Sequence, residues 1–183
     1  MVGDEPKFDY AFNKLLVLEG GYVDEQLDPG GATKYGVSLR FLKSINKDID
    51  LDGDVDVNDI RSITLEDSRD IARIYWWDKW KYGQIDNYEI AAKALDFSYN
   101  ANPKSCNKFM QLAANAYVTH KITVDGKMGP KTLAAINTIP KIHKTNQFMA
   151  KFRSQISTFY KNVVKRNPNL KYALKGLLNR AKA

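Results

Sequence analysis

The sequence predicts a mostly α-helical protein with a small loop or hairpin region after the first helix. Apolar residues recur at spacings of three and four over several segments of this 183-residue chain, which is the periodicity of a helix with one buried face. Prolines stand where several of these segments begin, as they do at first helical positions. Strand signals are few and short. With 44% apolar residues, the chain is long enough to bury one sizeable core.

The first predicted helix covers residues 6–18 and ends at Gly20 and Gly21, because glycine adopts the left-handed conformation found just past helix ends. Its apolar face consists of Phe8, Ala11, Phe12, Leu15 and Leu18. Residues 22–37 contain turn formers and predict a loop or small hairpin. Ser38 is positioned to cap a short helix that ends at Ile45. Thr64 and Asp67 resemble a capping box that opens a helix running to about residue 80.

Further helices are expected at 87–101, at 103–118 with Asn102 as the cap, and at 130–137. The longest helix is expected after Pro140, and Asn167-Pro168 should end it. Its apolar stripe consists of Phe148, Phe152, Ile156, Phe159 and Val163. A last amphipathic helix closes the chain. The cluster of Trp76, Trp77 and Trp80 is expected to be core, with stacking of one ring on a sugar as the alternative.

The net charge of +7 predicts a polyanionic partner such as nucleic acid, an anionic membrane or an acidic wall polymer. No nucleic-acid recognition motif is present, so a nucleic-acid partner is not expected. The sequence has no run of about 18 apolar residues, so stable membrane insertion is not expected. The N-terminus lacks the pattern of a signal peptide. The single cysteine, Cys106, lies on an apolar helical face and is expected to be a buried structural thiol. His120 and His143 match no metal spacing and are expected at the surface.

The segment DIDLDGDVDVND, residues 48–59, follows the spacing of an EF-hand calcium loop. Gly53 at the sixth position permits the sharp turn, and Asp59 replaces the usual glutamate at the twelfth. The six aspartates would repel one another without a cation. We therefore expect a structural Ca²⁺ site rather than a sensor, with a solvated acidic loop as the alternative. Its expected ligands are Asp48, Asp50, Asp52, Asp54 through its carbonyl, Asp56 and Asp59.

The stretch LLVLEGGYVDEQLDPGGATKYGVS, residues 15–38, places Glu19 in the last turn of the first predicted helix. The negative end of the helix dipole disfavours a charged carboxylate there, so Glu19 should stay protonated to higher pH, as a general acid requires. Asp28 supplies a second carboxyl across a turn, and paired carboxyls in different surroundings suit glycoside hydrolysis. The alternative is that Glu19 is an exposed helix end and Asp28 caps its turn.

The same stretch resembles the signature of the glycoside hydrolase family 108 muramidases, roughly E-G-G-[YF]-V, a spacer and D-P-G-G-A-T-x-Y-G-I. The resemblance continues through YWWDKW, residues 75–80, and VDGKMGPKTLAAIN, residues 124–137, is similar to the peptidoglycan-binding domain that follows the catalytic part in this family. It implies a lysozyme-like catalytic region over residues 7–95. A helical, peptidoglycan-binding region over 96–183 would pack on it.

The resemblance implies an enzyme of the phage endolysin or secretion activator type. It would cleave the β-1,4 bond between N-acetylmuramic acid and N-acetylglucosamine in peptidoglycan, as a monomer and without a catalytic cofactor. It would act in the periplasm or cell wall. Because no signal peptide is visible, the chain is expected to be made in the cytoplasm and released by a holin-like or other route.

Carried over by position, the family's catalytic glutamate falls on Glu19. Asp28 and Thr33 resemble the residues that hold or activate the attacking water in phage lysozymes. This chain has Asp24-Glu25 where the commoner family form has Asn-Asp, so these two carboxyls are alternatives to Asp28. The expected substrate contacts are the two tyrosines of the motif and two residues four apart on one later helix, namely Tyr22, Tyr35, Asp96 and Asn100.

Another class of function fits part of the same pattern. A peptidoglycan-binding, calcium-stabilised protein without catalysis would keep the acidic loop and the second region. The presence of Glu19 in its full motif favours the enzyme.

Overall fold

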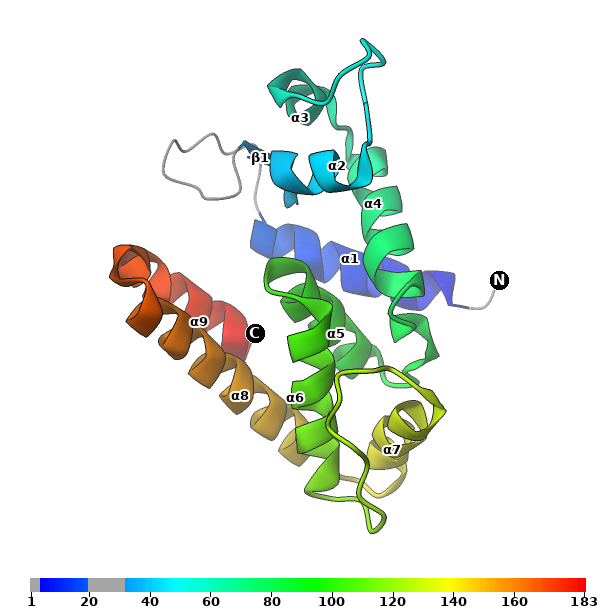
Figure 1. Cartoon of the computed structure of the whole chain (residues 1–183). Helices are drawn as coiled ribbons and strands as arrows, with labels where there is room; N and C mark the ends of the chain where they lie inside the picture. The colour runs from blue at the N-terminus through cyan, green and yellow to red at the C-terminus, as the bar shows by residue number, and fades with distance from the viewer. Residues whose placement is uncertain (1–3, 20–31) are drawn as a thin grey trace.

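The structure, a computed structural model, describes residues 4–19 and 32–183, with the backbone alone for Leu18 and Glu19. Figure 1 shows the helices Tyr88–Asn100 and Pro103–Asn115 at the centre of the molecule, the longest helix, Thr145–Arg166, along one side, and the acidic loop at one end. The prediction of a mostly α fold with a small hairpin is confirmed. The elements are α1 (Glu5–Glu19), β1 (Thr33–Lys34), β2 (Val37–Ser38), α2 (Leu39–Ile45), α3 (Val57–Ser62), α4 (Leu65–Ala72), the π-helical η1 (Arg73–Asp78), the 3₁₀ turn η2 (Tyr82–Gln84), α5 (Tyr88–Asn100), α6 (Pro103–Asn115), α7 (Pro130–Lys141), α8 (Thr145–Arg166), the 3₁₀ segment η3 (Pro168–Ala173) and α9 (Leu174–Lys182).

The predicted helix starts are confirmed by their capping contacts. Ser38 Oγ accepts a hydrogen bond from the amide of Phe41 (3.2 Å), and Asn102 Oδ1 accepts one from the amide of Ser105 (2.8 Å). Both α6 and α7 begin on a proline. These contacts satisfy amides that the first helical turn leaves without a backbone partner.

Thr64 opens α4 through the predicted capping box. Its Oγ1 accepts from the amide of Asp67 (3.1 Å), while Asp67 Oδ2 accepts from the amide of Thr64 (2.8 Å). Hydrogen bonds from Thr64, first from its hydroxyl and then from its amide, hold the pKa of Asp67 below its ordinary 3.8. The capping box therefore stabilises α4 most at pH values at which the Asp67 carboxyl is ionised.

We expect Thr64→Ala to lower the free energy of unfolding by about 1 kcal/mol at neutral pH, the usual cost of losing such a cap. A carboxyl whose pKa is lowered by folding contributes stability above its unfolded pKa, and this is lost as the pH falls through the folded value. The difference between variant and wild type should therefore shrink in acid below about pH 4. Urea unfolding at pH 7 and pH 3 measures it. Ser62→Ala, at an exposed helix end, is the control, and an equal loss in both variants would contradict the cap.

Several helix boundaries differ from the prediction. The helix α3 was not predicted, α6 ends at Asn115 rather than at 118, and α7 extends to Lys141 rather than 137. The longest helix, α8, begins at Thr145, because Pro140 lies inside the last turn of α7, where its missing N–H removes one terminal hydrogen bond. The helix from Thr64 gives way to the π segment η1 after Ala72, and the closing helix is divided into η3 and α9. The stripe of α8 also shifts by one residue at its end. Its buried members are Phe148, Met149, Phe152, Ile156, Tyr160 and Val164.

Two apolar clusters fill the described part of the molecule. The larger one joins α1, η1, η2, α5, α6, α7, α8 and α9, and its largest fully buried side chains include Phe8, Trp77, Tyr82, Phe97 and Phe152. The smaller one joins the hairpin with α2, α3 and α4 through Val37, Leu42, Ile60, Ile63 and Ile71. Trp76 packs against both clusters. The predicted boundary between residues 95 and 96 falls inside α5, whose buried residues belong to the larger cluster throughout.

Several smaller expectations are confirmed. Cys106 is buried, its Sγ donates to the carbonyl of Ala94 (3.4 Å), and burial raises the pKa of its thiol well above the ordinary value. His120 and His143 are exposed. Trp77 is fully buried and Trp76 and Trp80 pack against the larger cluster, so the tryptophans belong to the core.

Candidate active site

Two of the three predicted catalytic residues stand at the ends of described elements. Glu19 is the last residue of α1 and Thr33 is the first residue of β1. Asp28 and Tyr22, together with the alternatives Asp24 and Glu25, lie outside the described residues, as does the side chain of Glu19. The structure therefore defines the frame of this site, which consists of the helix that ends at Glu19 and the hairpin that begins at Thr33.

The N-terminal end of α1 is anchored by a cluster of ion pairs with α4 and η1. Arg73 Nη2 donates to Asp4 Oδ1 (2.7 Å), Arg69 pairs with Glu5 and Asp9, and Trp77 Nε1 donates to Asp4 Oδ2 (2.7 Å). Partial burial alone would raise the pKa of Asp4, but the bonds from Trp77 and Arg73 outweigh it and lower the pKa. This cluster holds α1 at the end opposite Glu19.

Packing on α5 fixes the direction of α1. Phe8, Ala11, Phe12 and Leu15 bury the face of α1 predicted from the sequence. Beside this buried face, Lys14 Nζ donates a hydrogen bond to Glu89 Oε2 at the start of α5 (2.7 Å). The hydroxyl of Tyr10 donates to the other carboxylate oxygen of Glu89. A helix held along its length in this way presents its last residue, Glu19, at a defined place.

The hairpin that carries Thr33 is tied to α3 and α4. Its turn places Tyr35 (φ 49°) and Gly36 (φ 78°) in the left-handed region, as a tight two-residue hairpin turn requires. Ser68 Oγ donates to the carbonyl of Tyr35 (3.1 Å), and Lys34 Nζ donates to the carbonyl of Arg61 (2.6 Å). The side chain of Tyr35, a predicted substrate contact, is half-buried and lies beside Lys34.

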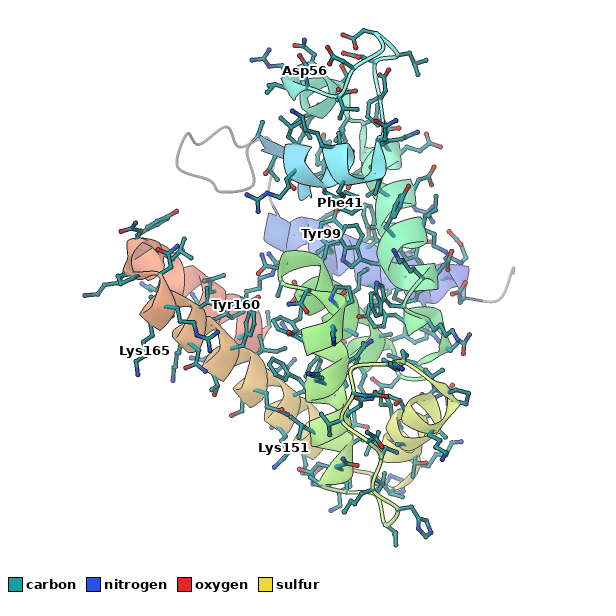
Figure 2. All side chains as sticks on the ribbon, in the orientation of Figure 1. Phe41, Asp56, Tyr99, Lys151, Tyr160 and Lys165 are labelled. Carbon is teal, nitrogen blue, oxygen red and sulfur yellow. The ribbon has the colours of Figure 1, made fainter. Side chains whose placement is uncertain are left out.

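Aromatic side chains meet between the hairpin cluster and α5. The ring centroid of Trp76 lies 4.6 Å from that of Phe41 and 4.5 Å from that of Tyr99, and Tyr75 contacts Phe41 edge to face. Trp76 Nε1 donates to the carbonyl of Ser98 (3.2 Å). Figure 2 shows Phe41 and Tyr99 lying close together between α2 and the end of α5. These rings form the wall that joins the two apolar clusters near the predicted site.

Asp96, predicted to contact the glycan, instead faces the interior. It is 3% exposed, Lys93 Nζ donates to its Oδ2 (2.9 Å), and Arg180 Nε of α9 donates to its Oδ1 (2.7 Å). Both carboxylate oxygens therefore have partners within the protein, and the geometry supports a role in holding α9 on α5. Burial lowers the pKa of Lys93, against the opposing effect of Asp96.

Asn100, the second predicted glycan contact on α5, is exposed at the end of that helix. Its Oδ1 accepts a hydrogen bond from the hydroxyl of Tyr160 on α8 (2.7 Å), and Figure 2 shows Tyr160 between α8 and α5. Asp96 and Asn100 thus share a helix as predicted, but the structure joins both to helices of the second half of the chain.

A hollow of about 250 Å³ lies between the second half of α1, the part of α5 from Glu89 to Asp96, and Ala183. Its walls include Lys14, Val17, Ala92 and Lys93, and Val17 is 84% exposed. The sequence indicated no such hollow, because it depends on how α1 and α5 cross. The hollow, whose lining also includes the charged residues Glu89 and Asp96, therefore lies beside the half of α1 that leads to the predicted proton donor.

The acidic loop brings its carboxylates into two groups. Asp48, Asp50 and Asp52 form one and Asp54, Asp56 and Asp59 the other, with the oxygens in each within 4.8 Å of one another. Gly53 has φ 102°, as the predicted sharp turn requires. The charge of Asp52 is the main cause that raises the pKa of Asp54.

Hydrogen bonds hold the two ends of this loop together. Asp48 accepts from the amides of Leu51 (2.6 Å) and Gly53 (3.0 Å), while buried Asp59 accepts from the amides of Ile49 (2.5 Å) and Asp56 (2.7 Å). The bonds to Asp59 outweigh its desolvation and lower its pKa. The loop therefore has the oxygen donors that a hard cation prefers, and Asp59 is already engaged in closing it.

The segment at residues 124–137 forms a connection to α7. Gln111 on α6 accepts from the amide of Gly126 (2.8 Å), and it donates to Asp125 Oδ1 (2.8 Å) and to the hydroxyl of Thr132 (3.1 Å).

Among the described helices, none has both the length and the apolar character that crossing a membrane would need.

Comparison with known proteins gives three findings. Residues 12–101 match the family model for glycosyl hydrolase 108, and residues 107–182 match the model described as a predicted peptidoglycan domain. The solved structure of SagA from Brucella abortus is similar over 97% of this chain and 94% of that chain, with a TM-score of 0.70 and 23% sequence identity. No curated protein matches the chain. The structural likeness concerns the fold, and the matched families associate the chain with peptidoglycan.

Proposed function

The chain belongs to the glycosyl hydrolase 108 family through residues 12–101 and carries a peptidoglycan domain in residues 107–182, and on this premise we propose that it hydrolyses peptidoglycan. The bond cleaved is the β-1,4 bond between N-acetylmuramic acid and N-acetylglucosamine. Glu19 acts as the proton donor, and Asp28 with Thr33 positions the attacking water. The observation that carries this proposal is that the whole EGG to YG motif lies within the matched hydrolase region.

The described frame supports this division of roles. Because α1 is anchored at its N-terminal end and packed along α5, the position of its last residue, Glu19, is fixed by the fold. A C-terminal helix position disfavours a charged carboxylate, which suits a group that must deliver a proton to the leaving oxygen. The test is the appearance of new reducing ends when purified wall is incubated with the protein.

The matched peptidoglycan domain favours one alternative, in which the protein binds wall without cleaving it. Such a protein would sediment with purified wall and release no fragments. The hydrolase is preferred because Glu19 is present in its complete motif. In either case the working site is the periplasm or cell wall, and we propose that the protein acts there as a monomer, in lysis or in opening the wall for secretion.

We also propose that the loop at residues 48–59 holds a structural Ca²⁺. The donors are carboxylate and carbonyl oxygens, which fit a hard cation and argue against zinc. Asp48, Asp50 and Asp52 would supply the first ligands and Asp56 could bind through water. Bound Ca²⁺ would offset the repulsion between neighbouring aspartates and so stabilise the loop, with no part in the chemistry at Glu19.

Calcium should stabilise the folded protein. A ligand that binds only the folded state at about 100 times its Kd adds about 2.7 kcal/mol to the free energy of unfolding. We expect the melting temperature to rise on adding Ca²⁺ to chelator-treated protein and to rise less with Mg²⁺, which prefers a stricter geometry. Differential scanning calorimetry with each ion measures this.

The double variant Asp50→Asn/Asp52→Asn should lose the calcium response and yet melt no lower than wild type in chelator, because it removes like charges. The control Glu66→Gln/Asp70→Asn changes two exposed acids of α4 and should keep the full response. A melting temperature of the wild type that is the same with Ca²⁺ and with chelator would sink the proposed site.

A further inference from the structure

A groove lies in the second half of the chain between the segment at residues 117–122 and α7. Its volume is about 560 Å³. Figure 1 places α7 at the end of the molecule opposite the acidic loop, so this groove is separate from the frame of Glu19 and Thr33. Nothing derived above for hydrolysis uses it.

One stripe of α7 forms a wall of the groove. Lys131, Ala134 and Thr138 follow one another at spacings of three and four, so they lie on one face of the helix. Ala134 and the neighbouring Ala135 have small side chains, and this is what leaves the wall hollow. Lys131 is exposed at one end of the stripe. At the other end the hydroxyl of Thr138 donates to the carbonyl of Ala134 (2.8 Å), which leaves its oxygen able to accept.

The opposite wall is held in place by its own hydrogen bonds. Lys121 Nζ donates to the carbonyls of Asn115 and Val118 (both 2.7 Å), where α6 ends. The side chain of Asn115 exchanges two hydrogen bonds with Ile122, one to its carbonyl and one from its amide (both 2.8 Å). Val118 is nearly buried and Ile142 is 39% exposed, so the groove has an apolar lining between two fixed walls. A preformed wall reduces the entropy lost when a ligand binds.

The half of the chain that forms the groove is strongly basic. Residues 97–183 contain sixteen lysines and arginines and one acid, Asp125. Asp125 Oδ1 is occupied by Gln111 Nε2 and by the amide of Lys127 (both 2.8 Å). No acid lines the groove, whereas Lys121, Lys131 and His120 do. Such a field attracts an anionic ligand and repels a cationic one.

From this geometry we propose that the groove binds the stem peptide of peptidoglycan, an inference that rests on the proposed action on the wall. Stem peptides are short chains rich in alanine that carry free carboxylates. Their methyl groups would lie against Ala134 and Val118, and a carboxylate would pair with Lys131. The extended chain needs a groove with small side chains along one wall, which the stripe on α7 provides. An uncharged glycan strand would make no use of the positive rim.

The experiment measures how much protein sediments with purified, intact sacculi. The full chain carries Glu19→Gln so that the wall is not consumed. We expect Lys131→Glu to weaken sedimentation by at least about tenfold, since a charge-assisted hydrogen bond is replaced by repulsion. Ala134→Gln fills the groove without changing the charge and should weaken binding as well. Lys165→Glu makes the same charge change at an exposed site at the far end of α8 (Figure 2), and it should bind nearly as the parent does.

Sacculi stripped of stem peptides by an amidase distinguish the ligand. This bare glycan keeps a free lactyl carboxylate on each muramic acid but has lost the alanine methyl groups. The parent should therefore bind it weakly, and Ala134→Gln should weaken that binding no further. If the parent, Lys131→Glu and Ala134→Gln bind intact sacculi equally, the groove does not bind the stem peptide. The proposed hydrolysis would be unaffected by that result. Undiminished binding of the parent to bare glycan would overturn the stem peptide as the ligand. A further outcome is that the chain with Glu19 intact releases no reducing ends while the groove variants still sediment less than their parent. That result would refute hydrolysis but leave the proposed groove in place. Unchanged melting temperatures show that each variant is folded.

Discussion

Glu19→Gln is expected to reduce the release of reducing ends from purified wall by about 10²–10⁴-fold, the usual contribution of a positioned general acid. Glutamine keeps the size and the hydrogen-bonding capacity of the side chain but cannot deliver a proton to the leaving oxygen. The fold should persist, because α1 is held by Phe8, Phe12 and Leu15 and by the ion pairs at its other end. Reducing-end release and the melting temperature are measured on the same preparation.

The control for this result is Glu66→Gln, the same change at an exposed site of α4. It should leave the rate of hydrolysis unchanged. Asp28→Asn and Thr33→Ala should each slow hydrolysis if they position water. Equal release by wild type and Glu19→Gln would show that the proton donor is wrongly assigned. New amino groups without new reducing ends would point to an amidase or a peptidase.

Asp96→Asn is expected to lower the free energy of unfolding by about 3–5 kcal/mol, the range for breaking a buried ion pair from one side. The side chains of Lys93 and Asp96 are each 5% exposed and that of Arg180 is 10% exposed. Asparagine would leave the charges of Lys93 and Arg180 without the carboxylate that offsets their loss of water. Urea unfolding at neutral pH measures the difference.

Exposed Asp70 on α4 offers the matched control, and Asp70→Asn should change the free energy of unfolding by less than about 0.5 kcal/mol. Replacing the three charges together by apolar residues, as Lys93→Met/Asp96→Leu/Arg180→Met, should recover much of the loss, because no buried charge is left without a partner. If Asp96→Asn proves as mild as Asp70→Asn, the ion pairs do not hold α9 on α5.

The buried ion pairs of Asp96 with Lys93 and Arg180 also connect the two matched regions. Asp96 belongs to the region that matches the hydrolase family, whereas Arg180 belongs to the region that matches the peptidoglycan domain. The buried faces of α5, α6 and α8 contribute to the same apolar cluster. Movement between the two regions would therefore have to break a buried ion pair and expose apolar surface.

The features predicted well from the sequence are those that depend on residues close together along the chain. Ser38, Thr64 and Asn102 cap the helices they were expected to cap, because an N-cap contact spans only two or three residues. The buried face of α1 and the hairpin followed from apolar spacing and turn formers in the same way. The acidic loop was recognised from aspartates at alternate positions, although the binding of Ca²⁺ itself stays a prediction.

The predictions that missed involve partners far away in the sequence. Asp96 was expected to face a glycan, but its partner Arg180 lies 84 residues further along the chain. Lys93 and Asp96 at a spacing of three were the one local sign of this cluster. The helix at 130–137 was expected to stop before Pro140, yet α7 includes this proline because the loss of one terminal hydrogen bond is small beside the burial of Ile136 and Ile139.

The sequence by itself determined the capped starts of α2, α4 and α6, the buried face of α1, and the motif that carries the proposed chemistry at Glu19, because each of these is encoded by neighbouring residues. Only the tertiary structure decided that Asp96 serves the interior, that Trp76 joins two apolar clusters, and that a groove opens beside Lys131 and Ala134. These features arise where separate helices cross. Their geometry depends on packing between residues that no local spacing relates to one another.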